Sequence, residues 1–159
     1  MNARRWTEVG AWCALVLVAD QLVKRWVVTA LGGGRSLDLL GSVLRLSYVT
    51  NKGGAFGLLN GLGGVMLVVS VLVLGLLLVL AWRLPLGGSG LLRAAYGGVL
   101  GGALSNVGDR LLRGHVVDYI GLEWKGHQLW PAFNLGDAGI TVGLIVMLLM
   151  QVVQPKERD

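Results

Sequence analysis

The sequence predicts an all-α membrane protein with four transmembrane helices and a small β-sheet cradle at the membrane surface. The 159-residue chain is 54% hydrophobic and only 14% charged, whereas a soluble domain carries about 25% charged residues. It contains four apolar segments that approach or reach the ~20 residues needed to cross a bilayer. One further stretch alternates in the manner of a strand. The length fits a single integral-membrane domain over residues 1–159.

The first predicted transmembrane helix covers residues 9–30 and is interrupted by charged residues. Asp20 and Lys24 lie four residues apart, so they share a helix face and can form an ion pair. Two interpretations stay open for Asp20. It is either part of a structural ion pair that faces other helices, or a group that faces an active site. Three consecutive glycines at 32–34 then end the helix.

Residues 35–60 are predicted to form a β and loop region at the membrane surface. The large apolar residues Leu44, Leu46 and Tyr48 recur at every second position, separated by Arg45 and Ser47. A period of two is typical of a strand. Asn51 follows this strand and leads into a glycine-rich turn that contains Gly54. Glycines let a backbone approach a ligand closely. An ordinary hairpin or loop turn is the competing interpretation.

The remaining apolar segments predict three more transmembrane helices. They cover residues 62–82, 91–112 and 138–154, and the first of them contains no charged residue. Residues 114–136 are expected to form a loop on the same side of the membrane as residues 35–60. Four spans place both chain ends on one side of a membrane. Lys and Arg are divided evenly between the two sides, so the positive-inside rule does not set the orientation.

Two overlapping pairs of glycines lie in the third predicted helix. Gly97 and Gly101 form one pair, and Gly98 and Gly102 form the other. Small residues spaced by four permit close packing of helices in lipid. We expect these glycines to form helix-packing faces.

Polar side chains gather at the inner ends of the last two apolar segments. Ionisable groups near membrane depth are costly and usually serve function. Asp137 stands at the start of the fourth predicted helix, where the helix dipole favours an anion. Asp118 lies between apolar residues and needs a partner or a proton. The other members of the group are Asn106, Asp109, Arg110 and Asn134.

Asp118 and Asp137 suggest the chemistry of an aspartic peptidase. Two carboxylates that share a site hold one proton between them. One of them can then accept a proton from water while the other stabilises the oxyanion that forms. Sequence spacing does not show that the two residues meet. Structural capping and ion pairing, and a pathway for protons or ions, are therefore alternative roles.

Other chemistries have less support in the sequence. His115 and His127 are the two histidines, and neither lies in a zinc motif. Cys13 is the single cysteine and is expected to be a small buried hydrophobe. No metal or cofactor is indicated. The net charge of +5 is scattered, without a basic run, which favours membrane lipids rather than nucleic acid as a partner.

Five blocks in one order resemble the lipoprotein signal peptidase, or signal peptidase II, family over nearly the whole chain. Each block alone is less specific than their shared order. The blocks are Asp20-Gln21 with Lys24; Asn51-Lys52-Gly53-Gly54-Ala55-Phe56-Gly57; Gly101-Gly102-Ala103 with Asn106, Asp109 and Arg110; Val116-Val117-Asp118-Tyr119-Ile120; and Trp130-Pro131-Ala132-Phe133-Asn134 with Asp137.

The resemblance implies a four-helix protein of the bacterial inner membrane, with cytoplasmic termini and a periplasmic sheet. This orientation makes the β-sheet cradle, the β and loop region over residues 35–60 and the loop over residues 114–136 extracytoplasmic. The resemblance also implies that Asp118 and Asp137 are the catalytic residues, near the extracytoplasmic face. The implied substrate is a prolipoprotein that already carries diacylglycerol on a cysteine, and cleavage falls just before that cysteine. We expect a monomer. The residues expected to support the site or bind substrate are Asp20, Asn51, Gly54, Asn106, Asp109, Arg110 and Asn134.

Two positions depart from the family pattern. Gly136 stands where alanine is usual, and Gly108 stands where a larger apolar residue is common. Both changes reduce bulk at the ends of the third and fourth helices without removing a chemical group. Three rival functions stay open at this point. They are a presenilin-type aspartic peptidase, a small transporter or proton-conducting protein, and a non-enzymatic assembly factor.

Overall fold

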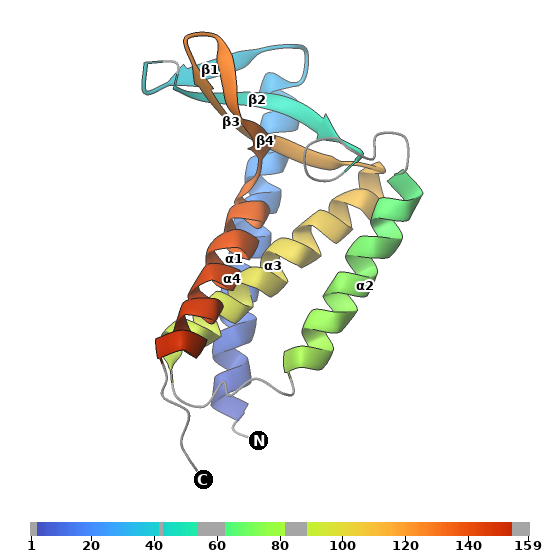
Figure 1. The fold of residues 1–159 in the computed structure, drawn as a ribbon. Coiled ribbons are helices and arrows are strands. Elements are labelled where there is room, and N and C mark those ends of the chain that lie inside the picture. Colours follow the sequence, from blue (N-terminus) through green and yellow to red (C-terminus); the bar gives the residue numbers. More distant parts are fainter. Residues whose placement is uncertain (1–2, 42, 54–62, 82–88, 154–159) are drawn as a thin grey trace.

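The structure is a computed structural model that describes residues 3–41, 43–53, 63–81 and 89–153. The sheet lies across one end of the helices, and α1 begins and α4 ends at the opposite end (Figure 1). The elements in chain order are α1 (Ala3–Leu31), β1 (Ser36–Leu39), β2 (Leu44–Asn51), α2 (Gly63–Ala81), α3 (Gly90–Arg113), β3 (Val116–Trp124), β4 (His127–Phe133) and α4 (Leu135–Val153).

The helix α3 is the centre of the helical layer and packs against α1, α2 and α4. Its two glycine pairs face different neighbours. A side chain at Gly97 would place its Cβ 2.6 Å from the carbonyl oxygen of Val9 in α1, and Gly101 likewise abuts α1. Gly98 and Gly102 face the backbone of α4. The expected packing role of these glycines is confirmed. A side chain at Gly97, Gly101 or Gly102 would collide with the backbone of the neighbouring helix, and Gly98 lies in ordinary contact with α4.

The four strands form one antiparallel sheet in the order β1-β2-β3-β4. The predicted strand around residues 44–49 is confirmed as β2. Its partner β3 comes from far along the chain, and their register sets Val49 opposite Asp118. A two-residue turn joins β3 to β4, with positive φ angles at Lys125 (49°) and Gly126 (80°). Two positive φ angles in succession are typical of the turn that best matches the twist of a hairpin.

Two expectations about the fold are corrected. The term all-α is wrong, since a four-stranded sheet accompanies the four helices. The loop expected over residues 114–136 is also wrong, because β3 and β4 occupy most of it. These strands form because β2 offers a pairing edge and because Val117 and Tyr119 pack in a core cluster with Val27 and Leu31 of α1.

The ends of the helices largely agree with the sequence pattern. α1 begins at Ala3, before the expected start at residue 9, and ends at Leu31, directly before the glycine run. α3 ends where Gly114 adopts a left-handed conformation with φ 73° and donates its N–H to the carbonyl of Arg110. Glycine enters this conformation without steric cost.

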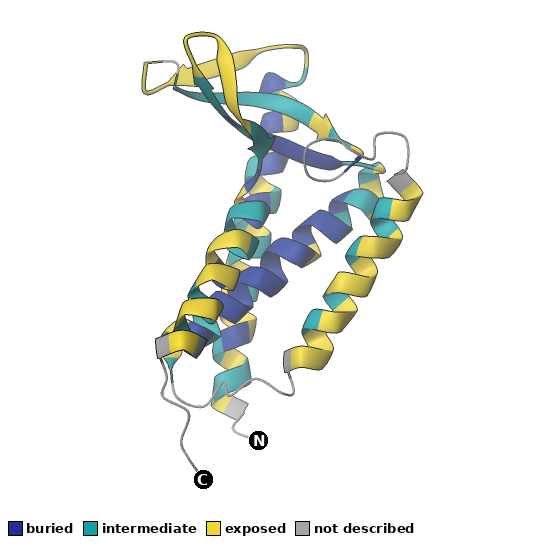
Figure 2. Ribbon diagram, viewed as in Figure 1, coloured by how far each residue is buried: buried dark blue, intermediate teal, exposed yellow. Residues whose placement is uncertain are grey.

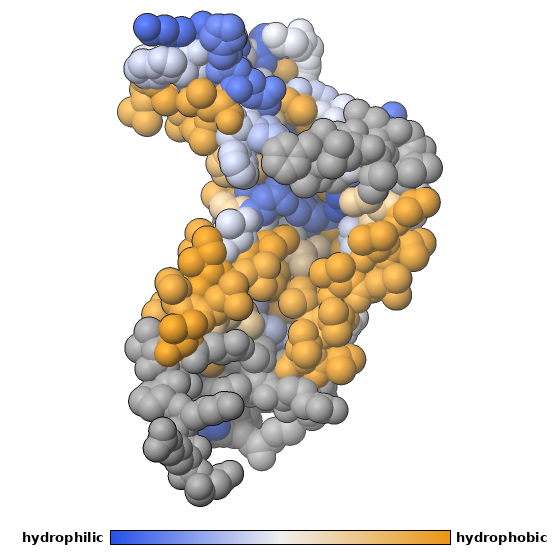
Figure 3. Space-filling model, in the orientation of Figure 1, coloured by the Kyte–Doolittle hydropathy of each residue, from blue (hydrophilic) through white to orange (hydrophobic). Residues whose placement is uncertain are grey.

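Large apolar side chains cover the outer surfaces of the helices. On α2 the side chains of Val68, Leu72, Leu76 and Val79 are between 57% and 66% exposed. Figure 2 shows α2 mostly in the colour of exposed residues, and Figure 3 shows its surface as hydrophobic. In the part of the chain that the structure describes, no helix combines the length and the apolarity expected of a membrane span.

Candidate active site

Asp118 lies on β3 and is nearly inaccessible to solvent, with 1% of its surface exposed. Its two carboxylate oxygens accept hydrogen bonds from amide side chains. Asn51, the last residue of β2, donates through Nδ2 at 2.9 Å, and Asn134 donates through Nδ2 at 2.7 Å. Burial raises the pKa of Asp118 to about 6, and the charge of Asp137 adds to this increase while the two amide donors oppose it.

Asp137 lies in the first turn of α4 and forms a reciprocal cap with Asn134. The backbone N–H of Asp137 donates to Asn134 Oδ1 at 2.8 Å, and the backbone N–H of Asn134 donates to Asp137 Oδ2 at 3.3 Å. This is the arrangement of a capping box, in which two free helix donors are satisfied at once. The other carboxylate oxygen, Oδ1, accepts a bond from Asn106 Nδ2 at 2.8 Å. Asp137 thus serves the helix end and also faces the site.

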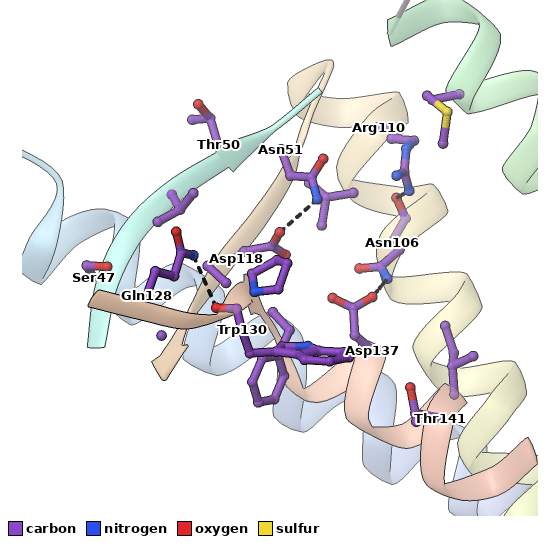
Figure 4. Close-up of a pocket in the computed structure, with 18 of the residues that line it drawn as sticks. Ser47, Thr50, Asn51, Asn106, Arg110, Asp118, Gln128, Trp130, Asp137 and Thr141 are labelled. Carbon is purple, nitrogen blue, oxygen red and sulfur yellow. Dashed lines mark hydrogen bonds between the residues drawn. The ribbon is translucent and has the colours of Figure 1, made fainter. Parts of the chain in front are cut away.

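The structure brings Asp118 and Asp137 together at one pocket of about 870 Å³. Figure 4 shows both side chains among the residues that line it. Asn134 bonds to both of them, through its side chain to Asp118 and through its backbone to Asp137. The strands β2 and β3 and the helices α3 and α4 supply the polar wall of this pocket. Side chains as far apart in the sequence as Asn51 and Asp137 therefore line the same site. The sequence could not establish this convergence.

Asn106 and Arg110 present one face of α3 to this pocket. Asn106 Oδ1 accepts bonds from Lys24 Nζ at 3.0 Å and from Asn134 Nδ2 at 3.2 Å, which fixes the amide so that its nitrogen points to Asp137. Arg110 donates through one terminal nitrogen to the carbonyl of Asn106 at 3.3 Å. Its Nε is buried and has no hydrogen-bond partner among the described residues.

A cluster of charges is buried beneath the pocket. Lys24, which has no solvent exposure, lies 2.6 Å from Asp20 Oδ2 and 3.0 Å from Asp109 Oδ2. Arg113 forms an ion pair with the other oxygen of Asp109. Ser105 donates to Asp20 at 2.5 Å. Two carboxylates and two cations balance within this cluster, as buried charges require.

The buried cluster holds β3 and α4 in place. Asp109 accepts the backbone N–H of Val117 at 3.0 Å. The hydroxyl of Tyr119 donates to Asp20 at 3.1 Å and accepts the N–H of Leu135 at 3.0 Å. Asp118 lies between Val117 and Tyr119 in the chain, so these bonds position its backbone on both sides.

The predicted site residues therefore fall into two groups. The first group lines the pocket and comprises Asn51, Asn106, Arg110, Asp118 and Asp137. Asn134 is not among the lining residues but hydrogen-bonds to both carboxylates. Asp20 and Asp109 are not among its lining residues and contact the buried cluster instead. This geometry favours the ion-pair interpretation of Asp20. Gly54 lies outside the described residues.

Four contributors were missed as site residues in the sequence. Lys24 was recognised only as a partner of Asp20, and the contacts of Gln21, Ser105 and Tyr119 were not foreseen. Local patterns give no signal for such contacts, which join residues more than 80 positions apart. The capping box did have a signal, because Asn134 and Asp137 show the spacing of such a box.

This arrangement has the groups needed to activate water for hydrolysis. The carboxylates of Asp118, which is buried, and Asp137, which is partly buried, line one pocket, where holding one proton between them is favoured over full ionisation. Asn51, Asn106 and Asn134 orient them through amide donors. Arg110 supplies an unused N–H beside them.

Comparisons with known proteins agree in pointing to one family. The profile of signal peptidase II (SPase II) matches residues 12–153. A lipoprotein signal peptidase from Halothermothrix orenii is 34% identical over 145 residues, which covers 91% of this chain and 95% of that protein. Another, from Moorella thermoacetica, is 41% identical over 133 residues, or 84% of this chain and 85% of that one.

Solved structures show the same fold. One bacterial membrane enzyme superposes with a TM-score of 0.80 at 27% identity, covering 96% of this chain and 93% of its own. A second gives a TM-score of 0.78 at 25% identity, with 94% of each chain covered. The family profile spans residues 12–153, which include both carboxylates and the residues that hold them. The protein therefore belongs to the signal peptidase II family of aspartic peptidases.

Proposed function

We propose that the protein is an intramembrane endopeptidase that removes the signal peptide from diacylglyceryl-modified prolipoproteins. Cleavage falls just before the lipidated cysteine, and Asp118 and Asp137 are the catalytic pair. The observation that carries this proposal is the meeting of the buried carboxylate of Asp118 and the partly buried carboxylate of Asp137 at one pocket, held by a shared partner, Asn134. The names of the relatives, lipoprotein signal peptidases, support the substrate class.

The pair catalyses hydrolysis through two proton transfers, one from the attacking water to a carboxylate and one from a carboxyl to the leaving amine. One carboxylate accepts a proton from a water molecule as its oxygen attacks the carbonyl carbon of the scissile bond. The protonated carboxyl donates a hydrogen bond to the carbonyl oxygen, where negative charge develops. As the C–N bond breaks, the leaving amine takes up a proton from a carboxyl. The raised pKa of Asp118, about 6, supports a proton that the pair retains to a higher pH than an ordinary carboxyl does.

Arg110 is suited to hold the substrate peptide. Its Nε is buried without a partner among the described residues and lies on the helix face that lines the pocket. An unsatisfied buried donor costs free energy, and a backbone carbonyl of the substrate would relieve that cost. Asn51, at the end of β2, also lines the pocket and is hydrogen-bonded to Asp118. Substrate binding is therefore expected to improve the hydrogen bonding of Arg110.

The apolar half of the pocket suits a lipid-modified peptide. Trp130 and Phe133 of β4, Ile140 of α4 and Met66 of α2 line it beside the carboxylates. Apolar walls next to a few convergent polar groups are typical of sites that bind a largely apolar ligand. The diacylglycerol of the substrate would occupy this side, with the scissile bond next to Asp118.

We place the protein in the bacterial cytoplasmic membrane, as a monomer, with the sheet on the extracytoplasmic side. Exposed leucine and valine side chains on the helices support burial in lipid, because soluble monomers rarely expose large contiguous apolar surfaces. The catalytic pair lies where α4 meets the sheet. That depth suits a scissile bond near the membrane surface.

Cleavage of a defined substrate tests the function. Purified protein in detergent is incubated with one prolipoprotein in two forms, with and without diacylglycerol on its cysteine, and the products are identified by mass spectrometry. We expect release of the signal peptide from the lipidated form only, with the modified cysteine at the new N-terminus. A matched control is Asp38→Asn, since Asp38 is an exposed carboxylate on β1 that pairs with Arg45 and does not line the pocket. Equal cleavage of both forms, or a cut at another bond, would overturn the proposal.

A further inference from the structure

A second hollow lies between α1 and α3 and has no part in the proposed chemistry. We call it the α1–α3 groove. It has a volume of about 590 Å³ and is lined by Leu17, Val18, Gln21, Leu22, Arg25, Leu104, Gly108, Leu112 and Arg113. Successive residues of a helix turn by ~100°, so positions two apart point in nearly opposite directions. Gly108 therefore opens the side of α3 that faces away from Asn106 and Arg110.

The groove is apolar along most of its length. Leu22 is 62% exposed and Leu112 is 83% exposed, so both leave large apolar surfaces open. Gly108 removes the side chain that would otherwise fill the middle. A Cβ built there would meet no atom within 4 Å. Contiguous exposed apolar surface of this kind marks a site of contact with lipid or protein.

Two arginines stand at the end of the groove that is nearest the sheet. Arg113 already pairs with Asp109 in the balanced buried cluster. Arg25 is exposed, and among the described residues no carboxylate pairs with its guanidinium. Arg25 is thus a surplus positive charge at the rim. Guanidinium groups favour phosphate oxygens because their N–H donors match them in geometry.

We propose that the α1–α3 groove is a binding site for a phospholipid with a net negative headgroup. The phosphate lies against Arg25, and one acyl chain occupies the leucine-lined part beside Gly108. This occupant fits both halves of the site, since charge complementarity selects the headgroup and apolar surface selects the chain. The inference rests on the membrane location given in the proposed function, but it concerns a different face of α3.

The test measures lipid retention directly. Purified protein in detergent micelles is mixed with equal amounts of phosphatidylglycerol and phosphatidylcholine, and bound lipids are counted by native mass spectrometry. Wild type is expected to retain phosphatidylglycerol preferentially. Arg25→Gln is expected to reduce that preference about fivefold, because one arginine near an anionic surface has about that effect. Arg35→Gln, an exposed arginine outside the groove, is the matched control.

A second variant tests the apolar half independently. Gly108→Leu fills open space and is expected to reduce retention of both lipids. Gly75→Leu is its control, because Gly75 also has open space around it but lies on α2. Equal retention of both lipids by wild type, or equal retention by the two leucine variants, would overturn the proposal. Asp118→Asn should lose cleavage and keep the lipid preference, so failure of the lipid site and failure of the proposed function are told apart.

Discussion

Replacing Asp118 by asparagine is expected to change how the stability of the protein depends on pH. The carboxyl of Asp118 is buried on β3, and its pKa rises from an ordinary 3.8 to about 6, first because of burial. Between these two values the folded protein binds more protons at this site than the unfolded chain does. Stability must therefore fall as the pH rises through this range. Asparagine cannot ionise, so the variant lacks this contribution.

The size of the effect follows from the shift. Each pKa unit corresponds to about 1.4 kcal/mol, so a rise of about two units amounts to about 3 kcal/mol of unfolding free energy. The stabilisation contributed by the neutral carboxyl of Asp118 is complete below about pH 4 and is lost above about pH 6. For a chain of this size, the wild-type melting temperature should fall by about 10 °C relative to the variant between pH 4 and pH 7.

Thermal unfolding in detergent across this pH range measures the difference. Asp38→Asn provides a control with the opposite sign. The hydrogen bond from Arg45 lowers the pKa of Asp38, so its contribution is lost on acidification instead. A difference between wild type and Asp118→Asn that stays constant from pH 4 to pH 7 would refute the reasoning, because the carboxyl would then be neither buried nor beside a second charge.

Two further predictions concern the buried charges and the helix packing. Lys24→Met leaves Asp20 and Asp109 buried without their shared cation, and should lower the unfolding free energy measured with denaturant by about 3–5 kcal/mol; a loss below about 1 kcal/mol would contradict the charge balance described. Gly143→Ala places a Cβ 2.6 Å from a backbone oxygen of α3 and should cost about 1–3 kcal/mol in the same assay. Gly75→Ala, in open space on α2, should be neutral or stabilising by up to ~1 kcal/mol, and equal effects of the two alanines would contradict the packing.

Local patterns in the sequence predicted the helices and one strand. Their signals lie within a few neighbouring residues, such as the alternation around Leu46 and the glycine run after Leu31. β3 and β4 escaped prediction because the charges at Asp118 and Glu123 and the proline at 131 weaken the alternation. The two-residue turn at Lys125 and Gly126 also gave a weak signal for this hairpin, because lysine stands where asparagine, aspartate or glycine is typical.

The site could be predicted in composition but not in arrangement. The sequence placed Asp118 and Asp137 near apolar segments, and the resemblance to a family supplied their pairing. Neither the sequence pattern nor the resemblance predicted the contacts that join Lys24 to Asn106 or Tyr119 to Asp20. Those contacts depend on how α1, α3 and β3 meet, which no local pattern encodes.

The central claim is that the carboxyl groups of Asp118 and Asp137 act as one catalytic unit. Its most direct test is kcat/KM on the lipidated prolipoprotein for wild type, Asp118→Asn, Asp137→Asn and the double variant, with folding checked by thermal melt. Each single variant should lose at least about a thousandfold, and the double variant should be no worse than either, since residues that act together have non-additive effects. Near-normal cleavage by either folded single variant, or losses that multiply in the double variant, would contradict the account.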